Sequence, residues 1–130
     1  MRYLSPLRYP GGKARLAPFF TRLIRAQVPA PTHYAEPYAG GAGAALRLLT
    51  NGAVDHIHIN DINAGIAAFW RTITTPGGAE AFSQLINNTP VTIDQWHHQR
   101  TIYQGGEADD LALGFATFYL NRTNRSGILD

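Results

Sequence analysis

Cysteine is absent from the 130-residue chain, so disulfide bonds and thiolate metal sites are excluded. Long apolar runs are also missing. No stretch reaches the roughly 20 apolar residues of a membrane-spanning helix, and the N-terminus lacks the apolar segment of a signal peptide. From these absences we expect a soluble, cytoplasmic protein without a membrane partner. Charged residues make up only 15% of the chain, and the net charge of +2 neither requires nor excludes a nucleic-acid partner.

The signatures of three common kinds of site are absent as well. No Gly-x-Ser-x-Gly segment occurs, so a serine hydrolase has no support. The turn Pro10-Gly11-Gly12-Lys13 is not a P-loop, because Leu7 stands in place of its first glycine and Ala14 in place of its Ser or Thr. No carboxylate cluster accompanies the histidines at ligand spacing, so we expect surface histidines and no metal. The histidines concerned are His56, His58, His97 and His98.

The first part of the chain alternates helix and strand patterns. Apolar residues recur at helical spacing in some segments, while others alternate apolar and polar residues as strands do. We predict a helix over 13–28, a strand over 33–36, a helix over 44–49, a strand over 54–60 and a helix over 63–74. Asn51-Gly52 is a typical helix end. This order predicts an α/β fold with a parallel sheet and Rossmann-like winding.

The pattern changes after Pro76-Gly77-Gly78, where no strand is predicted. Three helices are expected, over residues 79–88, 94–103 and 107–122, with Asp94 capping the second. We therefore divide the chain into residues 1–75, a partial α/β unit, and residues 76–130, a helical segment. Five aromatic residues are predicted to lie in the core rather than to stack on a ligand: Phe69, Trp70, Phe115, Phe118 and Tyr119.

The segment from Tyr34 to Gly43 is the strongest candidate for a binding loop. Its glycines let the backbone turn sharply and let a ligand approach closely. Asp61 follows about twenty residues later, at the end of the next strand, where Rossmann-type sites place an acidic residue that accepts hydrogen bonds from ribose. Leu46 replaces the third glycine of the dinucleotide motif, and Glu36 would face a pyrophosphate unfavourably. A ligand without phosphate and with a cationic group, such as S-adenosylmethionine, fits better; the alternative is a tight turn without a ligand.

Lys13 stands at the start of a predicted helix, where the helix dipole disfavours a cation. A carboxylate bound at this point would offset that cost. The alternative is an ordinary solvated lysine after a turn.

Taken together, four segments resemble the Dam-like, or D12, class of adenine-specific DNA methyltransferases. An aromatic-x-Gly-Gly-Lys motif is matched by residues 9–13, and an aromatic-x-Glu-Pro-aromatic-x-Gly-Gly-x-Gly motif by residues 34–43. The Asp-x-Asn motif is matched by residues 61–63, and Tyr-Leu-Asn-Arg by residues 119–122. The segments occur in the order and at the spacing of the family, which makes the combination specific.

The resemblance implies a cofactor, S-adenosyl-L-methionine, and a partner, double-stranded DNA. It places Lys13 on the cofactor carboxylate and Asp61 on its ribose. The residues implied in cofactor binding are Tyr9, Gly11, Gly12, Lys13, Glu36, Gly40, Gly41, Gly43 and Asp61. Residues 76–130 would begin the DNA target-recognition domain. Those implied in DNA binding are Asn121, Arg122 and Arg125.

The chain departs from the family at two points. The catalytic Asp/Asn-Pro-Pro-Tyr/Phe motif is missing, because no Pro-Pro occurs in the sequence. Where family members often have an aromatic-Asn-Gly, this chain reads Asn124-Arg125-Ser126-Gly127. We therefore expect an N-terminal portion of the enzyme that contains no catalytic residue and is inactive alone. The alternatives are a cofactor- or DNA-binding relic, or one half of a split enzyme whose catalytic half is a separate chain.

Overall fold

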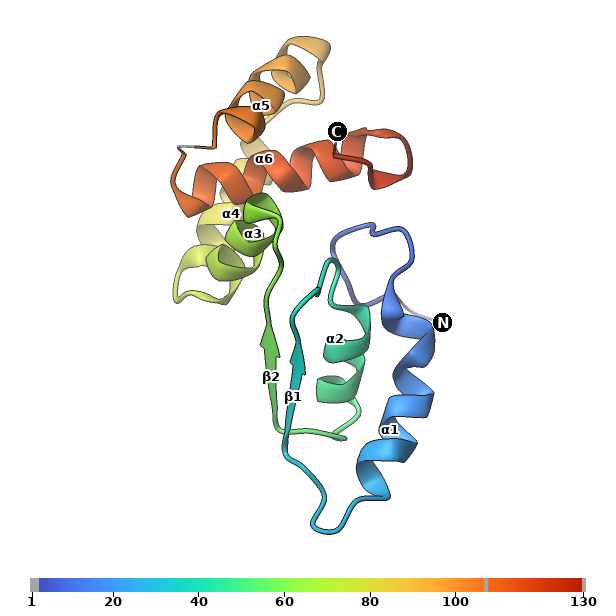
Figure 1. The fold of residues 1–130 in the computed structure, drawn as a ribbon. Coiled ribbons are helices and arrows are strands. Elements are labelled where there is room, and N and C mark those ends of the chain that lie inside the picture. Colours follow the sequence, from blue (N-terminus) through green and yellow to red (C-terminus); the bar gives the residue numbers. More distant parts are fainter. Residues whose placement is uncertain (1–2, 107, 130) are drawn as a thin grey trace. The chain divides into compact units, whose positions relative to one another are not determined.

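The structure, a computed structural model, describes residues 3–106 and 108–129 and is mixed α/β with mostly helical secondary structure (Figure 1). The chain forms two compact units, residues 1–61 and 62–130. The first unit carries the only sheet of the described part of the chain, and the second is built from helices. The division of function at residues 75 and 76 stays a prediction.

The first unit is a parallel βαβ arrangement preceded by a helix. Its elements are η1 (Lys13–Leu16), α1 (Ala17–Arg25), β1 (His33–Glu36), α2 (Gly43–Thr50) and β2 (His56–Ile59). Strands β1 and β2 pair in parallel, with His33 opposite His56 and Glu36 opposite Ile59. The Asn51-Gly52 helix end is confirmed, with Gly52 at a φ of +69°. The predicted parallel sheet and crossover helix are confirmed, as a two-stranded sheet consistent with a partial Rossmann-like unit.

One face of this sheet holds the core of the first unit. Ile24 of α1, Leu48 of α2 and Val54 are buried together, and Tyr34 and Ile57 of the strands pack against them. Helices α1 and α2 thus lie on the same side of the sheet (Figure 1). The apolar side chains that alternate along the strands point to this side, and the histidines point to the other.

Helix α1 is shorter than predicted and uses only part of its apolar surface. It ends at Arg25, three residues before the predicted end at Val28. Of its apolar residues Ala17 and Ile24 are buried, whereas Phe19 and Leu23 are each about half exposed. The periodicity identified the helix but did not show which apolar residues the unit would cover.

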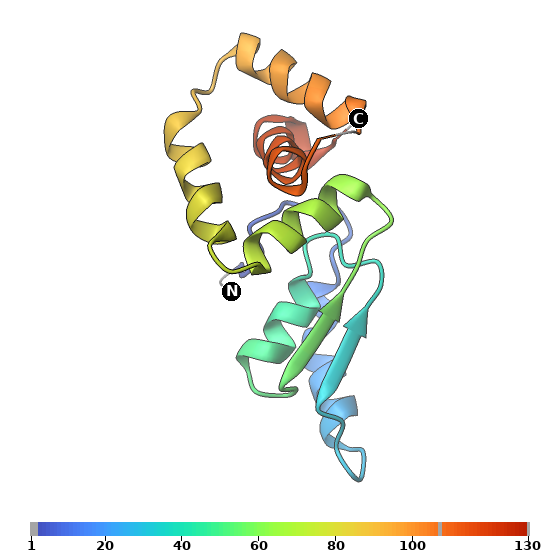
Figure 2. The same cartoon turned by 90° about the vertical axis from the view of Figure 1, so that its left-hand side faces the viewer.

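The second unit consists of four helices and a final turn. These are α3 (Ala64–Thr74), α4 (Gly78–Asn88), α5 (Ile93–Gly105), α6 (Asp110–Thr123) and η2 (Arg125–Gly127). Helix α6 is central, and Figure 2, which looks along it, shows α3, α4 and α5 around it. Within the described residues no strand follows β2, as expected. The predicted start of α6 at residue 107 lies outside the described residues.

An aromatic cluster forms the core of the helical unit. Phe69 of α3 packs edge-on to Phe82 of α4, at 5.4 Å between ring centroids, and stacks with Phe118 of α6 at 6.1 Å. Phe115 and Tyr119 complete the aromatic side of α6 and are 4% and 5% exposed. Phe69, Trp70, Phe115 and Tyr119 are buried and Phe118 is partly buried, which confirms that the five aromatic residues belong to the core. Gly114 lets α6 approach α3 closely, since a Cβ there would lie 2.8 Å from the Phe69 backbone.

The predicted cap of α5 is wrong. Thr92, not Asp94, precedes the helix, and its hydroxyl accepts a hydrogen bond from the Gln95 N–H at 3.2 Å. Asp94 lies inside the first turn, where its negative charge interacts favourably with the helix dipole and stabilises the helix. Thr92 has the extended conformation of an N-cap residue, and its hydroxyl satisfies one of the free N–H groups of the first turn.

Candidate cofactor and DNA-binding sites

The glycine loop and Asp61 meet at one edge of the sheet. Because β1 and β2 are parallel, the segments that follow them leave the sheet at the same end. The Gly40 N–H donates a hydrogen bond of 2.8 Å to Asp61 Oδ2, and the Ala39 N–H donates one of 2.9 Å to the Asn60 carbonyl oxygen. The structure therefore places Asp61 directly beside the loop, as the sequence motif predicts.

Glu36 is a buried carboxylate at the end of β1, only 2% exposed. Its Oε2 accepts a hydrogen bond of 3.1 Å from the Ala45 N–H in the first turn of α2. Its Oε1 has no hydrogen-bond donor among the described residues, and the Lys13 ammonium 3.1 Å away compensates its charge. A buried carboxylate without such compensation would be strongly unfavourable.

Lys13 connects the N-terminal turn to the end of β1. Besides the ion pair with Glu36, its Nζ donates a hydrogen bond of 2.5 Å to the Tyr38 carbonyl oxygen. The Lys13 side chain is still 37% exposed, so water reaches part of it. The predicted carboxylate partner exists, but in this structure it is the protein's own.

Tyr34 lies on the same face of β1 as Glu36. Burial, together with the negative charge of Glu36 and a hydrogen bond to it, raises the pKa of Tyr34 to about 12. The phenol therefore stays protonated throughout the physiological pH range.

The N-terminal segment packs directly on the glycine loop. A Cβ at Gly40, where φ is +49°, would lie 2.8 Å from the Tyr9 ring. At Gly41 the nearest atom would be Ser5 Oγ, also at 2.8 Å, and at Gly43 it would be Ala14 Cβ at 2.9 Å. The three glycines thus make room for the first motif of the protein itself. This close approach was not foreseen, because glycine spacing does not tell which atoms come near.

All the residues predicted to bind the cofactor belong to the first unit, and the structure brings most of them together. Tyr9, Lys13, Glu36 and Asp61 surround the glycine loop. Gly11, at a φ of +71°, forms the turn that lies between Tyr9 and Lys13. The arrangement combines the partly exposed Lys13 side chain, the Asp61 carboxylate that follows the second strand, and a glycine loop on which the N-terminal segment packs.

The histidines lie on the surface, as predicted. His33, His56 and His58 share the outer face of the sheet, with His33 Nδ1 2.8 Å from His58 Nε2. His97 and His98 are exposed on α5. Across the described ranges, no group of three or more His, Asp or Glu side chains could hold a metal ion.

The predicted DNA-binding residues fall into two kinds. Arg122 and Arg125 are exposed, and neither has an ion-pair partner among the described residues. Asn121 is completely buried, and its side-chain amide donates a hydrogen bond of 3.0 Å to the Gly127 carbonyl oxygen. In this structure Asn121 supports the turn that carries Arg125, where Ser126 has a φ of +58°.

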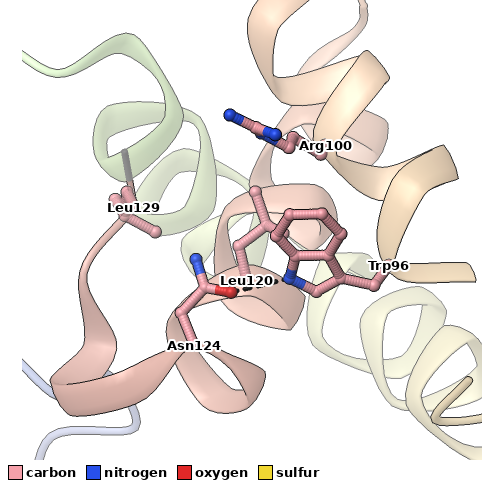
Figure 3. A pocket seen from close by; sticks show the side chains of 5 residues that line it. All are labelled: Trp96, Arg100, Leu120, Asn124 and Leu129. Atoms are coloured by element: carbon pink, nitrogen blue, oxygen red, sulfur yellow. Dashed lines mark hydrogen bonds between the residues drawn. The ribbon is translucent and has the colours of Figure 1, made fainter. Parts of the chain in front are cut away.

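A small pocket near that turn was not found from the sequence (Figure 3). It has a volume of about 110 Å³. Its lining consists of Trp96, Arg100, Leu120, Asn124 and Leu129. The Arg100 guanidinium lies over the Trp96 ring, 5.3 Å from its centroid. Trp96 Nε1 donates a hydrogen bond of 2.7 Å to Asn124 Oδ1, and the Asn124 amide donates one of 2.6 Å to the Ile128 carbonyl oxygen.

The spacing of Trp96 and Arg100, four residues apart on one helix, is the sequence signal that would have identified this pair. Arg100 is exposed and has no ion-pair partner within the described part of the chain. In contrast, both the oxygen and the nitrogen of the Asn124 side-chain amide make hydrogen bonds within the protein. It stands in the segment that lacks the aromatic residue common in similar sequences, and here it holds the tryptophan in place.

Comparison with known proteins gives one match. The sequence model of the D12 class N6 adenine-specific DNA methyltransferase family matches residues 9–107. No curated protein and no solved structure matches the chain. The matched range contains the first three motifs and all the predicted cofactor-binding residues, whereas residues 119–122 lie beyond it. None of the helices in the described part of the chain is long and apolar enough to cross a membrane.

Proposed function

The chain belongs to the D12 class N6 adenine-specific DNA methyltransferase family, and we propose that it supplies the cofactor-binding part and the beginning of the DNA-recognition part of a site-specific enzyme. The first unit binds S-adenosylmethionine, and the helical segment after residue 76 begins the target-recognition domain. The observation that carries the cofactor assignment is the contact between Asp61 and the Gly40 N–H at the carboxyl ends of two parallel strands.

The residues of this site fit S-adenosylmethionine in chemical character. Asp61 supplies the carboxylate that accepts hydrogen bonds from ribose hydroxyls. The exposed side of the Lys13 ammonium receives the carboxylate of the methionine moiety, and Glu36 holds Lys13 from the buried side. Gly40 and Gly41 let the N-terminal segment with Tyr9 and Ser5 pack closely on the loop, which brings Tyr9 beside the site. When bound, the cofactor supplies an activated methyl group.

The helical unit offers exposed cations for DNA. Arg100, Arg122 and Arg125 are exposed and have no ion-pair partner within the described residues. The pocket joins Arg100 of α5 to the segment after α6 that contains Arg125. Arginine contacts of this kind bind phosphates and position a protein on a duplex. We assign the direct contacts to these arginines and give Asn121 the role of holding the turn that carries Arg125.

Methyl transfer needs residues that this sequence does not contain. Base flipping and transfer to the adenine amino group require a pocket that stacks the base and accepts hydrogen bonds from that amine. The motif that similar enzymes use contains Pro-Pro, which is absent from these 130 residues. In our proposal a Pro-Pro segment elsewhere, on this polypeptide or on a partner chain, completes the site. A relic that only binds the cofactor or DNA is the second candidate, favoured by the same absence.

Calorimetry with S-adenosylmethionine tests the cofactor assignment. We expect the chain to bind with a one-to-one stoichiometry, and Asp61→Ala to weaken the affinity by roughly 1–3 kcal/mol, the cost of removing one partner from a buried polar contact. Asp55→Ala is the matched control, because it removes an exposed carboxylate from the same unit. Absence of binding by the wild-type chain, or equal losses in both variants, would reject the assignment.

A further inference from the structure

Asn63, the last residue of the Asp-x-Asn motif, is held at both ends of its side chain. Its Oδ1 accepts a hydrogen bond of 3.1 Å from the Ile66 N–H and so caps α3. Its Nδ2 donates a hydrogen bond of 2.8 Å to the Tyr103 hydroxyl, forty positions further along the chain on α5. The cap alone would need only the oxygen. The second bond fixes which way the amide faces and ties the start of α3 to α5.

The packing around this hydrogen bond is tight. Gly65, in the first turn of α3, lies against Tyr103 and against Thr117 of α6. A Cβ at Gly65 would be 3.0 Å from Tyr103 Cε2 and would overlap Thr117 Oγ1. Thr117 is itself buried, with its hydroxyl bonded to the Leu113 carbonyl oxygen at 2.8 Å. The start of α3 therefore has little freedom to shift relative to α5 and α6.

We propose that Tyr103 is a positioning residue for cofactor binding, acting through Asn63 on Asp61. This inference rests on the proposed function of Asp61. Only Ile62 separates Asp61 from Asn63, and Ile62 is 89% exposed, so it provides no packing of its own. Along the chain after Asp61, the first side chain held by hydrogen bonds is that of Asn63. The hydroxyl of Tyr103 thus fixes one end of the segment that presents the ribose-binding carboxylate, while the Gly40 N–H fixes the carboxylate itself.

The test is the affinity of the chain for S-adenosylmethionine in calorimetry, with Tyr103→Phe as the variant. This change removes the hydroxyl and keeps the ring against Gly65. We expect roughly 2- to 10-fold weaker binding, the range that corresponds to one lost hydrogen bond. Tyr119→Phe is the matched control, because that hydroxyl, on the same helical unit, donates a hydrogen bond of 3.1 Å to the Pro90 carbonyl oxygen and makes none to the Asp-x-Asn motif. Its affinity should equal that of the wild type.

A double-mutant cycle separates positioning from general loss of structure. If Tyr103 acts through Asp61, then Tyr103→Phe causes no further loss of affinity in the Asp61→Ala background. Asn63→Ser breaks the same hydrogen bond from the other side and retains a capping oxygen. It should therefore weaken cofactor binding in the same way, and it replaces Tyr103→Phe if that variant does not fold. The proposal is overturned if Tyr103→Phe binds as the wild type does, if Tyr119→Phe loses as much, or if the loss persists without Asp61. A wild-type chain that binds no cofactor rejects the proposed function and this inference together, whereas normal wild-type binding with an unaffected Tyr103→Phe rejects this inference alone.

Discussion

Lys13 and Glu36 form an ion pair between the first two sequence motifs, with Nζ 3.1 Å from Oε1. The carboxylate is buried, whereas the lysine side chain is 37% exposed. The pair therefore serves two purposes. It compensates a charge that the end of β1 could not bury alone, and it holds a partly exposed lysine side chain beside the glycine loop, where we propose that the cofactor carboxylate binds.

Lys13→Met should destabilise the first unit, because it leaves the buried Glu36 carboxylate without its compensating charge. We expect a loss of roughly 1–2 kcal/mol in the free energy of unfolding, less than for a fully buried pair since water reaches Lys13. Urea unfolding measures this loss. Arg15→Met is the control, because it removes a nearby exposed cation that has no ion-pair partner among the described residues. Similar stability of the two variants would show that the pair contributes nothing.

The glycine loop provides a second pair of variants. Gly40→Ala combines a positive φ with a Cβ that would lie 2.8 Å from the Tyr9 ring, so the expected loss of stability is roughly 2 kcal/mol or more. Gly11→Ala shares the positive φ but has no atom within 4 Å of the added carbon, and should cost only about 1 kcal/mol. Thermal unfolding of both variants compares them directly. Equal losses would mean that the Tyr9 ring moves away without cost.

A surface ion pair gives a pH-dependent prediction in the helical unit. A bidentate hydrogen bond from Arg71 lowers the pKa of Asp110, against a small opposing effect of burial. A lowered carboxyl pKa in the folded state means that the stabilisation is present above the unfolded-state pKa and is lost as the pH falls through the folded-state value. Asp110→Asn should therefore cost less than about 1 kcal/mol at neutral pH, since both side chains are about half exposed. The free energies of unfolding of the variant and the wild type should become equal in acid. Denaturant titrations at several pH values measure this difference, and a difference that persists in acid would contradict the prediction.

The sequence predicted the arrangement of the first unit well, because each signal there was local. Alternating residues identified β1 and β2, and the glycine loop and Asp61 followed from strand-end chemistry. The sequence could not show that the glycines accommodate Tyr9, Ser5 and Ala14, since nothing local encodes which segment folds back over a loop. Nor did the apolar periodicity of α1 show that Phe19 and Leu23 would stay about half exposed.

In the helical unit the sequence predicted the elements and their aromatic core, but not the roles of its polar residues. Asn121 stands next to an exposed arginine, yet α6 turns its side chain inward, where it bonds the Gly127 carbonyl oxygen. The contact between Arg100 and Trp96 was not predicted, because the position of Trp96 in the sequence fits equally well with a core residue. The hydrogen bond between Asn63 and Tyr103 joins residues forty positions apart, and no spacing rule predicts such a pair.

The chain alone should not methylate DNA. Transfer requires the adenine amine to be held in line with the activated methyl group and its developing positive charge to be stabilised, and such positioning and electrostatic preorganisation supply much of the catalysis. Duplex DNA and radiolabelled S-adenosylmethionine should therefore give no label on adenine N6 above a no-protein control. The protein for this assay must come from a host without adenine methylation. Labelled N6-methyladenine would show that these residues form a complete catalytic site.

The exposed arginines of the helical unit should bind DNA mainly through phosphates. Because each phosphate contact releases counterions, Arg122→Gln should weaken cognate and random duplexes to a similar degree and make the salt dependence shallower by about one unit of slope. Arg100→Gln and Arg125→Gln should behave alike if the pocket and the turn belong to one surface. Arg22→Gln is the charge-matched control, since it removes one exposed cation from α1 in the other unit. Fluorescence anisotropy at several salt concentrations distinguishes the possibilities. An unchanged slope of the salt dependence in all three variants would exclude these arginines from the interface. A loss of affinity confined to one cognate sequence would indicate base contacts instead. An equal effect of Arg22→Gln would mean that only the net charge matters.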